Sequence, residues 1–134
     1  MEDIFVARLM SPDVVTVTPD TFVEDAAETL IDERIGSLVV VDGDNQPAGI
    51  LTSTDFVHIV ARSKPKAETT VERYMTDRVI TVGPQETVRA AADRMITYNI
   101  HHLPVVDDSE GVIGMLSTAD LTTYVSELEQ PLPA

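Results

Sequence analysis

The sequence predicts an α+β fold of two β-α-β-β-α repeats, packed face to face about a pseudo-twofold axis. The first observation is that the chain matches itself without a gap after a shift of 65 residues, as from Met10 to Met75. A fixed period of this kind marks a tandem duplication. The second is that each copy alternates β-rich runs with apolar residues at helical spacing. The repeats are expected at residues 1–64 and 65–134, and each would cover the apolar sheet face that the other leaves open.

The internal match covers most of each copy, from Val6–Val60 onto Val71–Val125. Identical residues recur in the expected strands, helices and turns alike, which coincidence does not explain. They include Val14 and Val79, Thr16 and Thr81, Pro19 and Pro84, Ala26 and Ala91, Leu38 and Leu103, Gly49 and Gly114, and Asp55 and Asp120.

The first copy opens with a β-rich strand at Val14–Val17, which Pro19 closes. Thr21 and Glu24 then form a capping-box pattern at the start of a helix. Apolar residues at spacings of three and four place one face of this helix inward. The inward residues are expected to be Val23, Ala26, Ala27, Leu30 and Ile31.

A hairpin and a second helix complete the copy. The apolar run Leu38–Val41 and the segment Ala48–Leu51 flank a turn rich in Asp and Gly. A helix follows from about Ser53 to Arg62, and Ser63–Thr70 links the copies. On that helix, Phe56, Ile59 and Val60 are expected to face inward. The second copy is expected to repeat these elements, with strands at Val79–Val82, Leu103–Val106 and Val112–Leu116 and helices at Val88–Ile96 and from Thr118.

The composition excludes several classes of function. The 134 residues contain no Cys, so disulfides, Cys-ligated zinc, iron–sulfur clusters and thiol catalysis are excluded. Asp and Glu number 23 against 9 Lys and Arg, a net charge of −14 that repels nucleic acid and anionic membranes. The only lysines are Lys64 and Lys66, a scarcity that favours adaptation to a salty cytoplasm, where carboxylate repulsion is screened. No apolar run could span a membrane and residues 1–10 lack the apolar region of a signal peptide, so a cytoplasmic location is expected.

One repeated segment could carry chemistry. Gly49–Asp55 recurs as Gly114–Asp120, and both copies keep a Gly, two apolar residues, a hydroxyl and an Asp three residues later. The hydroxyl lies where strand gives way to helix, and free N–H groups at a helix start suit an anion such as a phosphate. The Asp suits a diol such as a ribose. A hydroxyl and an acid at this spacing can equally be a plain helix cap.

The order of these motifs closely resembles the CBS domain, named after cystathionine β-synthase. Thr16–Pro19 and Thr81–Pro84 match the first strand of that domain. Leu103–Asp107 matches its L-P-V-V-D segment, with Leu38–Asp42 as the counterpart, and the hydroxyl-x-x-Asp segment follows twice. The resemblance covers nearly the whole chain and implies a tandem CBS pair, or Bateman module. Such modules bind AMP, ADP, ATP, S-adenosylmethionine and sometimes NAD, and usually form homodimers.

The resemblance implies two ligand sites, each shared by the repeats. The hydroxyl and Asp of one repeat would hold ribose and phosphate, while segments of the other repeat would hold adenine. The first copy has Arg34 where some relatives contact phosphate, and the second has Asn99, so unequal sites are expected. Site A would comprise Pro12, Val14, Arg34, Ile35, Gly36, Ser117, Thr118 and Asp120, and site B Thr52, Thr54, Asp55, Asp77, Val79, Asn99, Ile100 and His101.

The adjacent histidines His101 and His102 are candidates for a ligand or metal contact. Neighbours on a strand-like segment point opposite ways, so one metal would not take both. We expect one histidine to be partly buried and the other exposed, with His101 the candidate ligand contact. No Ser-His-Asp arrangement, Walker or Rossmann loop, or metal-ligand spacing is found, so no catalytic residue, no metal site and no enzymatic activity are expected.

The leading hypothesis is a small-ligand sensor that binds an adenosine derivative. AMP or S-adenosylmethionine is favoured over ATP because the acidic field penalises polyanions. Binding would change a shape that an unidentified regulated protein reads. No cofactor is expected besides this ligand, with Mg²⁺ as a candidate companion ion. The alternatives are a dimerisation or protein-interaction module with empty clefts, and a divalent-cation or salt sensor.

Overall fold

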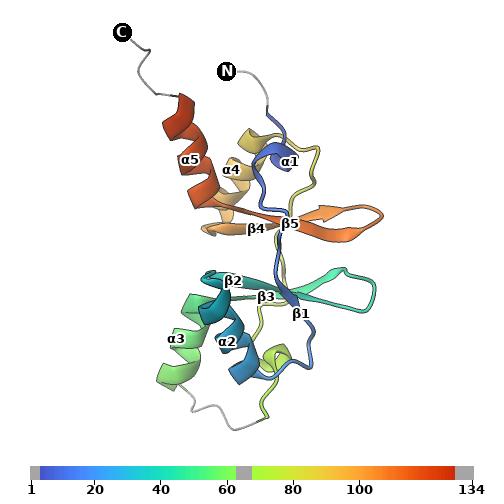
Figure 1. Cartoon of the computed structure of the whole chain (residues 1–134), viewed down its shortest axis with the longest axis vertical. Helices are drawn as coiled ribbons and strands as arrows, with labels where there is room; N and C mark the ends of the chain where they lie inside the picture. Colours follow the sequence, from blue (N-terminus) through green and yellow to red (C-terminus); the bar gives the residue numbers. More distant parts are fainter. Residues whose placement is uncertain (1–3, 63–67, 129–134) are drawn as a thin grey trace. The chain divides into compact units, whose positions relative to one another are not determined.

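The computed structural model describes residues 4–62 and 68–128 (Figure 1). The chain divides into two compact units. The first-repeat unit holds the described residues of Val14–Val79 together with Glu110–Val112. The second-repeat unit holds the described residues up to Asp13, Ile80–Ser109 and those from Ile113 onward. Residues 63–67 of the predicted linker lie outside the described residues.

A three-stranded sheet is the centre of the first-repeat unit. Strand β1 (Thr16–Val17), shorter than predicted, pairs in parallel with β2 (Ser37–Val41). β2 pairs antiparallel with β3 (Pro47–Thr52), which gives the order β1-β2-β3. The helices of this unit are α2 (Val23–Glu33), α3 (Ser53–Arg62) and the short 3₁₀ helix η1 (Val71–Arg73).

The second-repeat unit follows the same plan with a smaller sheet. Strands β4 (His102–Asp107) and β5 (Gly111–Ser117) form a two-stranded sheet. Its helices are α1 (Val6–Leu9), α4 (Val88–Tyr98) and α5 (Thr118–Leu128). The predicted α+β class is therefore confirmed, and both copies keep the predicted order of helix, two strands and helix after the first strand.

Where a strand was predicted, the second copy has a single parallel bridge, between Val82 and Val105. Pro104 stands where β2 has Val39, and it has no N–H with which to extend the pairing as Val39 does opposite Thr16.

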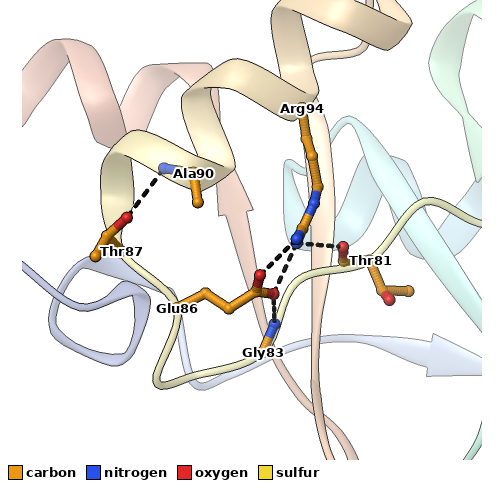
Figure 2. A network of polar contacts seen from close by, with 6 residues as sticks. All are labelled: Thr81, Gly83, Glu86, Thr87, Ala90 and Arg94. Carbon is orange, nitrogen blue, oxygen red and sulfur yellow. Dashed lines mark hydrogen bonds and ion pairs between the residues drawn. The ribbon is translucent and has the colours of Figure 1, made fainter.

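Side chains contact the backbone on either side of Val82. Figure 2 shows these contacts. Arg94 Nη1 donates a hydrogen bond to the Thr81 carbonyl at 3.1 Å. The Gly83 N–H donates to Glu86 Oε2 at 2.7 Å. These two hydrogen bonds hold the backbone on both sides of the bridge.

The same contacts predict a pH-dependent contribution to stability. Hydrogen bonds from Arg94, at 2.5 and 2.7 Å, hold the pKa of Glu86 below its ordinary value of 4.5. Because the Glu86 side chain is 38% exposed, solvent screening limits the cost of Glu86→Gln to about 1 kcal/mol of unfolding free energy at pH 7. A lowered pKa means that this contribution is present above pH 4.5 and is lost as the pH falls through the folded-state pKa.

Urea unfolding of the wild type and Glu86→Gln between neutral and acidic pH measures this contribution. Glu28→Gln, on the exposed surface of α2, is the matched control. A penalty for Glu86→Gln that does not exceed the control at pH 7, or that grows on acidification, would show that the ion pair does not stabilise the fold.

Each unit has its own core, and the segment before each first strand lies in the core of the other repeat. Val6 on α1 is fully buried with Leu103 in the second-repeat unit. Its equivalent, Val71 on η1, is fully buried with Leu38 in the first-repeat unit. The compact units therefore exchange these leading segments relative to the two repeats of the sequence.

The buried stripe of the helices is narrower than predicted. Ile31 on α2 and Val60 on α3 were both expected inward, and this was wrong, since each is 74% exposed. Leu30 and Ile59, the residues immediately before them, are buried as predicted, so the next position round the helix points away from the core. Their equivalents Ile96 and Val125 are also exposed, at 78% and 50%.

The predicted capping box of Thr21 and Glu24 does not form. The N-cap residue of α2 is Phe22, not Thr21, and the Phe22 side chain makes no hydrogen bond. The Thr21 hydroxyl instead accepts from the Thr18 N–H at 3.2 Å, within the turn that precedes the helix. In the second copy, Thr87 Oγ1 accepts from the Ala90 N–H at 3.1 Å and caps α4.

Candidate functional site

In the first-repeat unit, the hydroxyl-x-x-Asp segment forms a reciprocal cap. β3 ends at Thr52 and α3 begins at Ser53. The Thr52 N–H and Oγ1 donate to Asp55 Oδ2 at 2.8 and 3.1 Å. The Asp55 N–H donates to Thr52 Oγ1 at 3.4 Å. These contacts fix the Asp55 carboxylate over the first turn of α3.

The second-repeat unit builds the same cap at α5. The Ser117 N–H and Oγ donate to Asp120 Oδ2 at 2.8 and 3.1 Å, and the Asp120 N–H donates to Ser117 Oγ at 3.2 Å. The capping interpretation is therefore confirmed in both copies. Within the described residues no hydrogen bond engages Oδ1 of Asp55 or Asp120, and both side chains are half-buried. One carboxylate can thus serve a cap and still contact a ligand.

Close packing accounts for the glycine that opens each motif. A Cβ on Gly49 would lie 2.4 Å from Met75 Sδ, and a Cβ on Gly114 would lie 2.7 Å from Met10 Sδ. The two methionines are equivalent in the repeats and pack against the core of their own unit. The repeated glycines therefore need no ligand to explain them.

Segments that were expected to face adenine are hydrogen-bonded to the motif of their own repeat. The Ser53 N–H donates to the Gly36 carbonyl at 2.9 Å, and the Thr118 N–H donates to the His101 carbonyl at 3.0 Å. The pairing with the motif of the other repeat, which the resemblance implies, stays a prediction. Because β2 and β3 pair antiparallel along their length, the residue before β2 meets the first residue of α3. The hairpin predicted from the sequence already brings the residue before its first strand close to the end of its second strand, so this contact could have been predicted.

The other predicted site residues lie at helix ends and before the first strands. Arg34 and Asn99 are the C-caps of α2 and α4, with left-handed φ of 55° and 52° and exposed side chains. Ile35 and Ile100, which follow them, pack against the cores of their own units. Of the remainder, Thr54, Asp77 and Pro12 are exposed, and Val14 and Val79 are half-buried.

The two histidines differ in exposure, as expected. His101 is exposed, whereas His102, at the start of β4, is half-buried. Burial lowers the pKa of His102, the neighbouring His101 lowers it further, and the Asp120 carboxylate acts in the opposite direction. His102 is therefore electrostatically coupled to the motif carboxylate. From the sequence both histidines are candidates and only His101 is assigned to a site, although Ser37, the equivalent of His102, opens β2 beside the first motif.

A cleft opens beside the second motif, within the second-repeat unit. It has a volume of about 310 Å³. Its lining residues are Arg8, Leu9, Asp120, Thr123, Tyr124 and Glu127. Across residues 4–62 and 68–128, no three His, Asp or Glu side chains are grouped so as to hold a metal ion. None of the helices in this described part has the length and apolar character needed to cross a bilayer.

Two segments of the chain, residues 6–62 and 71–127, match the CBS domain family. The chain is 38% identical over 125 residues to a homoserine O-acetyltransferase of Methanosalsum zhilinae, a match that covers 93% of this chain and 25% of that protein. It is 34% identical over 117 residues to an L-aspartate semialdehyde sulfurtransferase of Methanocaldococcus jannaschii, covering 87% of this chain and 22% of that one. It is 33% identical to an uncharacterized 17.7 kDa protein of Acidianus ambivalens and spans 70% of its length. The chain thus spans a quarter or less of the two relatives named as enzymes.

Solved structures show the same fold. The CBS domain pair of protein MJ0100, in complex with 5′-methylthioadenosine and S-adenosyl-L-methionine, matches with a TM-score of 0.88 and 30% identity, covering 96% of this chain and 100% of that one. A protein with CBS domains from Burkholderia ambifaria matches with a TM-score of 0.84 and 33% identity, covering 98% and 100%. The repeated fold, the two capped motifs and the two matched segments agree, and the chain belongs to the CBS domain family as a tandem pair of these domains.

Proposed function

We propose that this chain is a regulatory module that binds an adenosine-containing ligand through the carboxylates of Asp55 and Asp120. The observation that carries the proposal is the repeated cap, which orients each carboxylate and leaves its Oδ1 without a hydrogen-bond partner among the described residues. An ionised carboxylate oxygen accepts hydrogen bonds from hydroxyls such as those of a ribose. The MJ0100 domain pair, 30% identical over 96% of this chain, is complexed with two adenosine compounds, which supports the same ligand class here.

The ligand is proposed to be one without a polyphosphate. A net charge of −14 disfavours the approach of a polyanion such as free ATP, whereas AMP, 5′-methylthioadenosine and S-adenosylmethionine carry less negative charge. We propose that sites A and B comprise the same residues that the family resemblance implies. A ligand with different affinities for two shapes of the module would shift their populations, and a regulated protein would read the shift.

We infer that the chain is not itself catalytic. The relatives named as enzymes match it over only 25% and 22% of their own lengths. Their shared segment is a CBS pair, and we propose that it regulates rather than catalyses.

Thermal unfolding in the presence of candidate ligands tests the proposed function. A ligand at about 100 times its Kd adds about 2.7 kcal/mol to the unfolding free energy, which raises the Tm of a chain of this length by several degrees. We expect a selective rise with AMP, 5′-methylthioadenosine or S-adenosylmethionine, measured in molar KCl to screen the acidic surface. An unchanged Tm with all three at millimolar concentration would refute the proposal and favour a protein-interaction module.

We also propose that the chain forms a homodimer through its helices. Ile31 and Val60 are exposed apolar residues, and so are their equivalents Ile96 and Val125. Exposed apolar residues that gather into a patch mark interaction surfaces, and the occurrence of these residues at equivalent positions of both repeats suits a symmetric contact between two copies. Sedimentation equilibrium of the wild type should show a dimer. The double variant Ile31→Asp, Ile96→Asp should be a monomer. The control Thr97→Asp, at an exposed position next to Ile96 on α4, should remain a dimer. A wild-type monomer would contradict this.

A further inference from the structure

The cleft of the second-repeat unit carries charges of both signs that do not pair with one another. Its volume of about 310 Å³ is within the range of small-molecule sites. Arg8, in the last turn of α1, supplies a guanidinium, and Asp120 and Glu127 on α5 supply carboxylates. Within the described part of the chain, no ion pair joins Arg8 to either carboxylate. The Arg8 guanidinium and the two carboxylates therefore border the same cleft, and each can form hydrogen bonds to a ligand.

The local structure explains why these groups meet. Asp120, Thr123 and Glu127 are three and four residues apart, so they share one face of α5. α1 packs against this helix within the same unit. Leu9 and Tyr124, both half-buried, add apolar surface to the wall of the cleft. A ligand group that fits here needs both charged ends and a short apolar body.

The mixed charge selects among ligand groups. A phosphate would meet two carboxylates, and a simple cation would meet the Arg8 guanidinium. A zwitterion satisfies both signs, because charge-assisted hydrogen bonds form at each of its ends. Asp120 is also the carboxylate proposed to bind ribose, so the cleft borders the proposed adenosine site.

The first repeat carries a different charge pattern at the equivalent positions. Where α5 has Thr123 and Glu127, α3 has His58 and Arg62. These two residues share one helix face with Asp55, and Arg73 on η1 is the equivalent of Arg8. A single carboxylate is therefore accompanied there by two arginines and a histidine. The pattern of one cation and two carboxylates is therefore a property of the second repeat.

We propose that this cleft binds the zwitterionic α-amino-acid group of an adenosine ligand whose ribose is held at Asp120, an inference that rests on the proposed function. Arg8 binds the carboxylate of that group, and Glu127 binds its ammonium. S-adenosylmethionine carries such a group beyond its 5′ sulfur. 5′-Methylthioadenosine shares the adenosine and the sulfur but lacks the amino-acid group, so comparing the two compounds isolates the cleft.

Calorimetric titration of both compounds into an Asp55→Asn chain, where only the second motif is intact, tests the inference. Arg8→Gln or Glu127→Gln in this background is expected to weaken S-adenosylmethionine about tenfold, through the loss of one charge-assisted hydrogen bond. Binding of 5′-methylthioadenosine is expected to stay within about twofold of the parent chain. Arg62→Gln, at the position equivalent to Glu127, is the matched control and should change neither affinity.

Each outcome separates this inference from the proposed function. If Arg8→Gln and Glu127→Gln weaken both compounds equally, or leave both unchanged, the amino-acid subsite is refuted while the adenosine site stands. If the Asp55→Asn chain binds neither compound although the wild type binds one, the second repeat holds no ligand and the inference is overturned. If the wild-type chain binds neither, the proposed function fails and the inference fails with it.

Discussion

Changing both Asp55 and Asp120 to asparagine is expected to weaken adenosine-ligand binding by about 10- to 100-fold at each site. A hydrogen bond to a charged group contributes about 1.5–3 kcal/mol, which corresponds to this range of affinity. Asparagine is chosen because its amide oxygen can still accept from the N–H of Thr52 or Ser117, whereas alanine would also remove the cap at a cost of about 1 kcal/mol. Isothermal titration of AMP, 5′-methylthioadenosine and S-adenosylmethionine measures the effect.

The single variants show which repeat binds, and the chain offers a matched control. Asp25→Asn with Asp93→Asn removes two carboxylates from exposed positions on α2 and α4 and should leave affinity unchanged. Circular dichroism establishes that every variant is folded. If the double motif variant binds within about twofold of the wild type, the carboxylates are helix caps only and the proposed ligand contacts are wrong.

Gly111→Ala is expected to destabilise the first-repeat unit by about 3 kcal/mol, as the sum of two effects. Gly111 has a φ of +78°, a left-handed conformation that costs other residues about 1–2 kcal/mol. A Cβ there would lie 2.2 Å from the Asn45 carbonyl oxygen, and overpacking adds about 1–3 kcal/mol. The same carbonyl accepts from the Val112 N–H at 2.9 Å, so moving it aside would break that hydrogen bond.

Urea unfolding of Gly111→Ala measures this cost. Gly43→Ala is the control, because a Cβ on Gly43 meets nothing within 4 Å, and its stability should stay within about 0.5 kcal/mol of the wild type. An unfolding midpoint for Gly111→Ala equal to that of the control would show that this contact is not part of the folded chain.

The elements that could be predicted from the sequence are those set by local pattern. The helix from Ser53 to Arg62 has the predicted bounds, because its apolar spacing and its cap lie within the segment itself. The caps at Asp55 and Asp120 were predictable for the same reason. The internal duplication made each pattern visible twice, which separated the signal from chance.

Contacts between distant segments could not be predicted in this way. Asn45 Nδ2 donates to the carbonyls of Glu110 and Val112, both at 2.9 Å, and thereby joins this turn to the first-repeat unit. Nothing in the sequence of a turn indicates such a partner. The contacts of Glu86 and Arg94 with the backbone beside Val82 likewise depend on hydrogen bonds that only the folded chain brings together.

The candidate site likewise contains residues that local pattern predicts and contacts that only the fold creates. The motif carboxylates were found from spacing, whereas the contacts of Gly36 and His101 with the motifs of their own repeats depend on how each hairpin pairs. The cleft beside Asp120 depends on the packing of α1 against α5, so Arg8 and Glu127 had no signal in either segment alone.

The most direct test of adenosine binding is a crystal structure of the chain grown with 5′-methylthioadenosine. We expect the ribose hydroxyls to lie at hydrogen-bond distance, about 2.5–3.0 Å, from Oδ1 of Asp55 or Asp120. A compound bound with its ribose facing neither carboxylate, or crystals that hold none at millimolar concentration, would contradict the proposal.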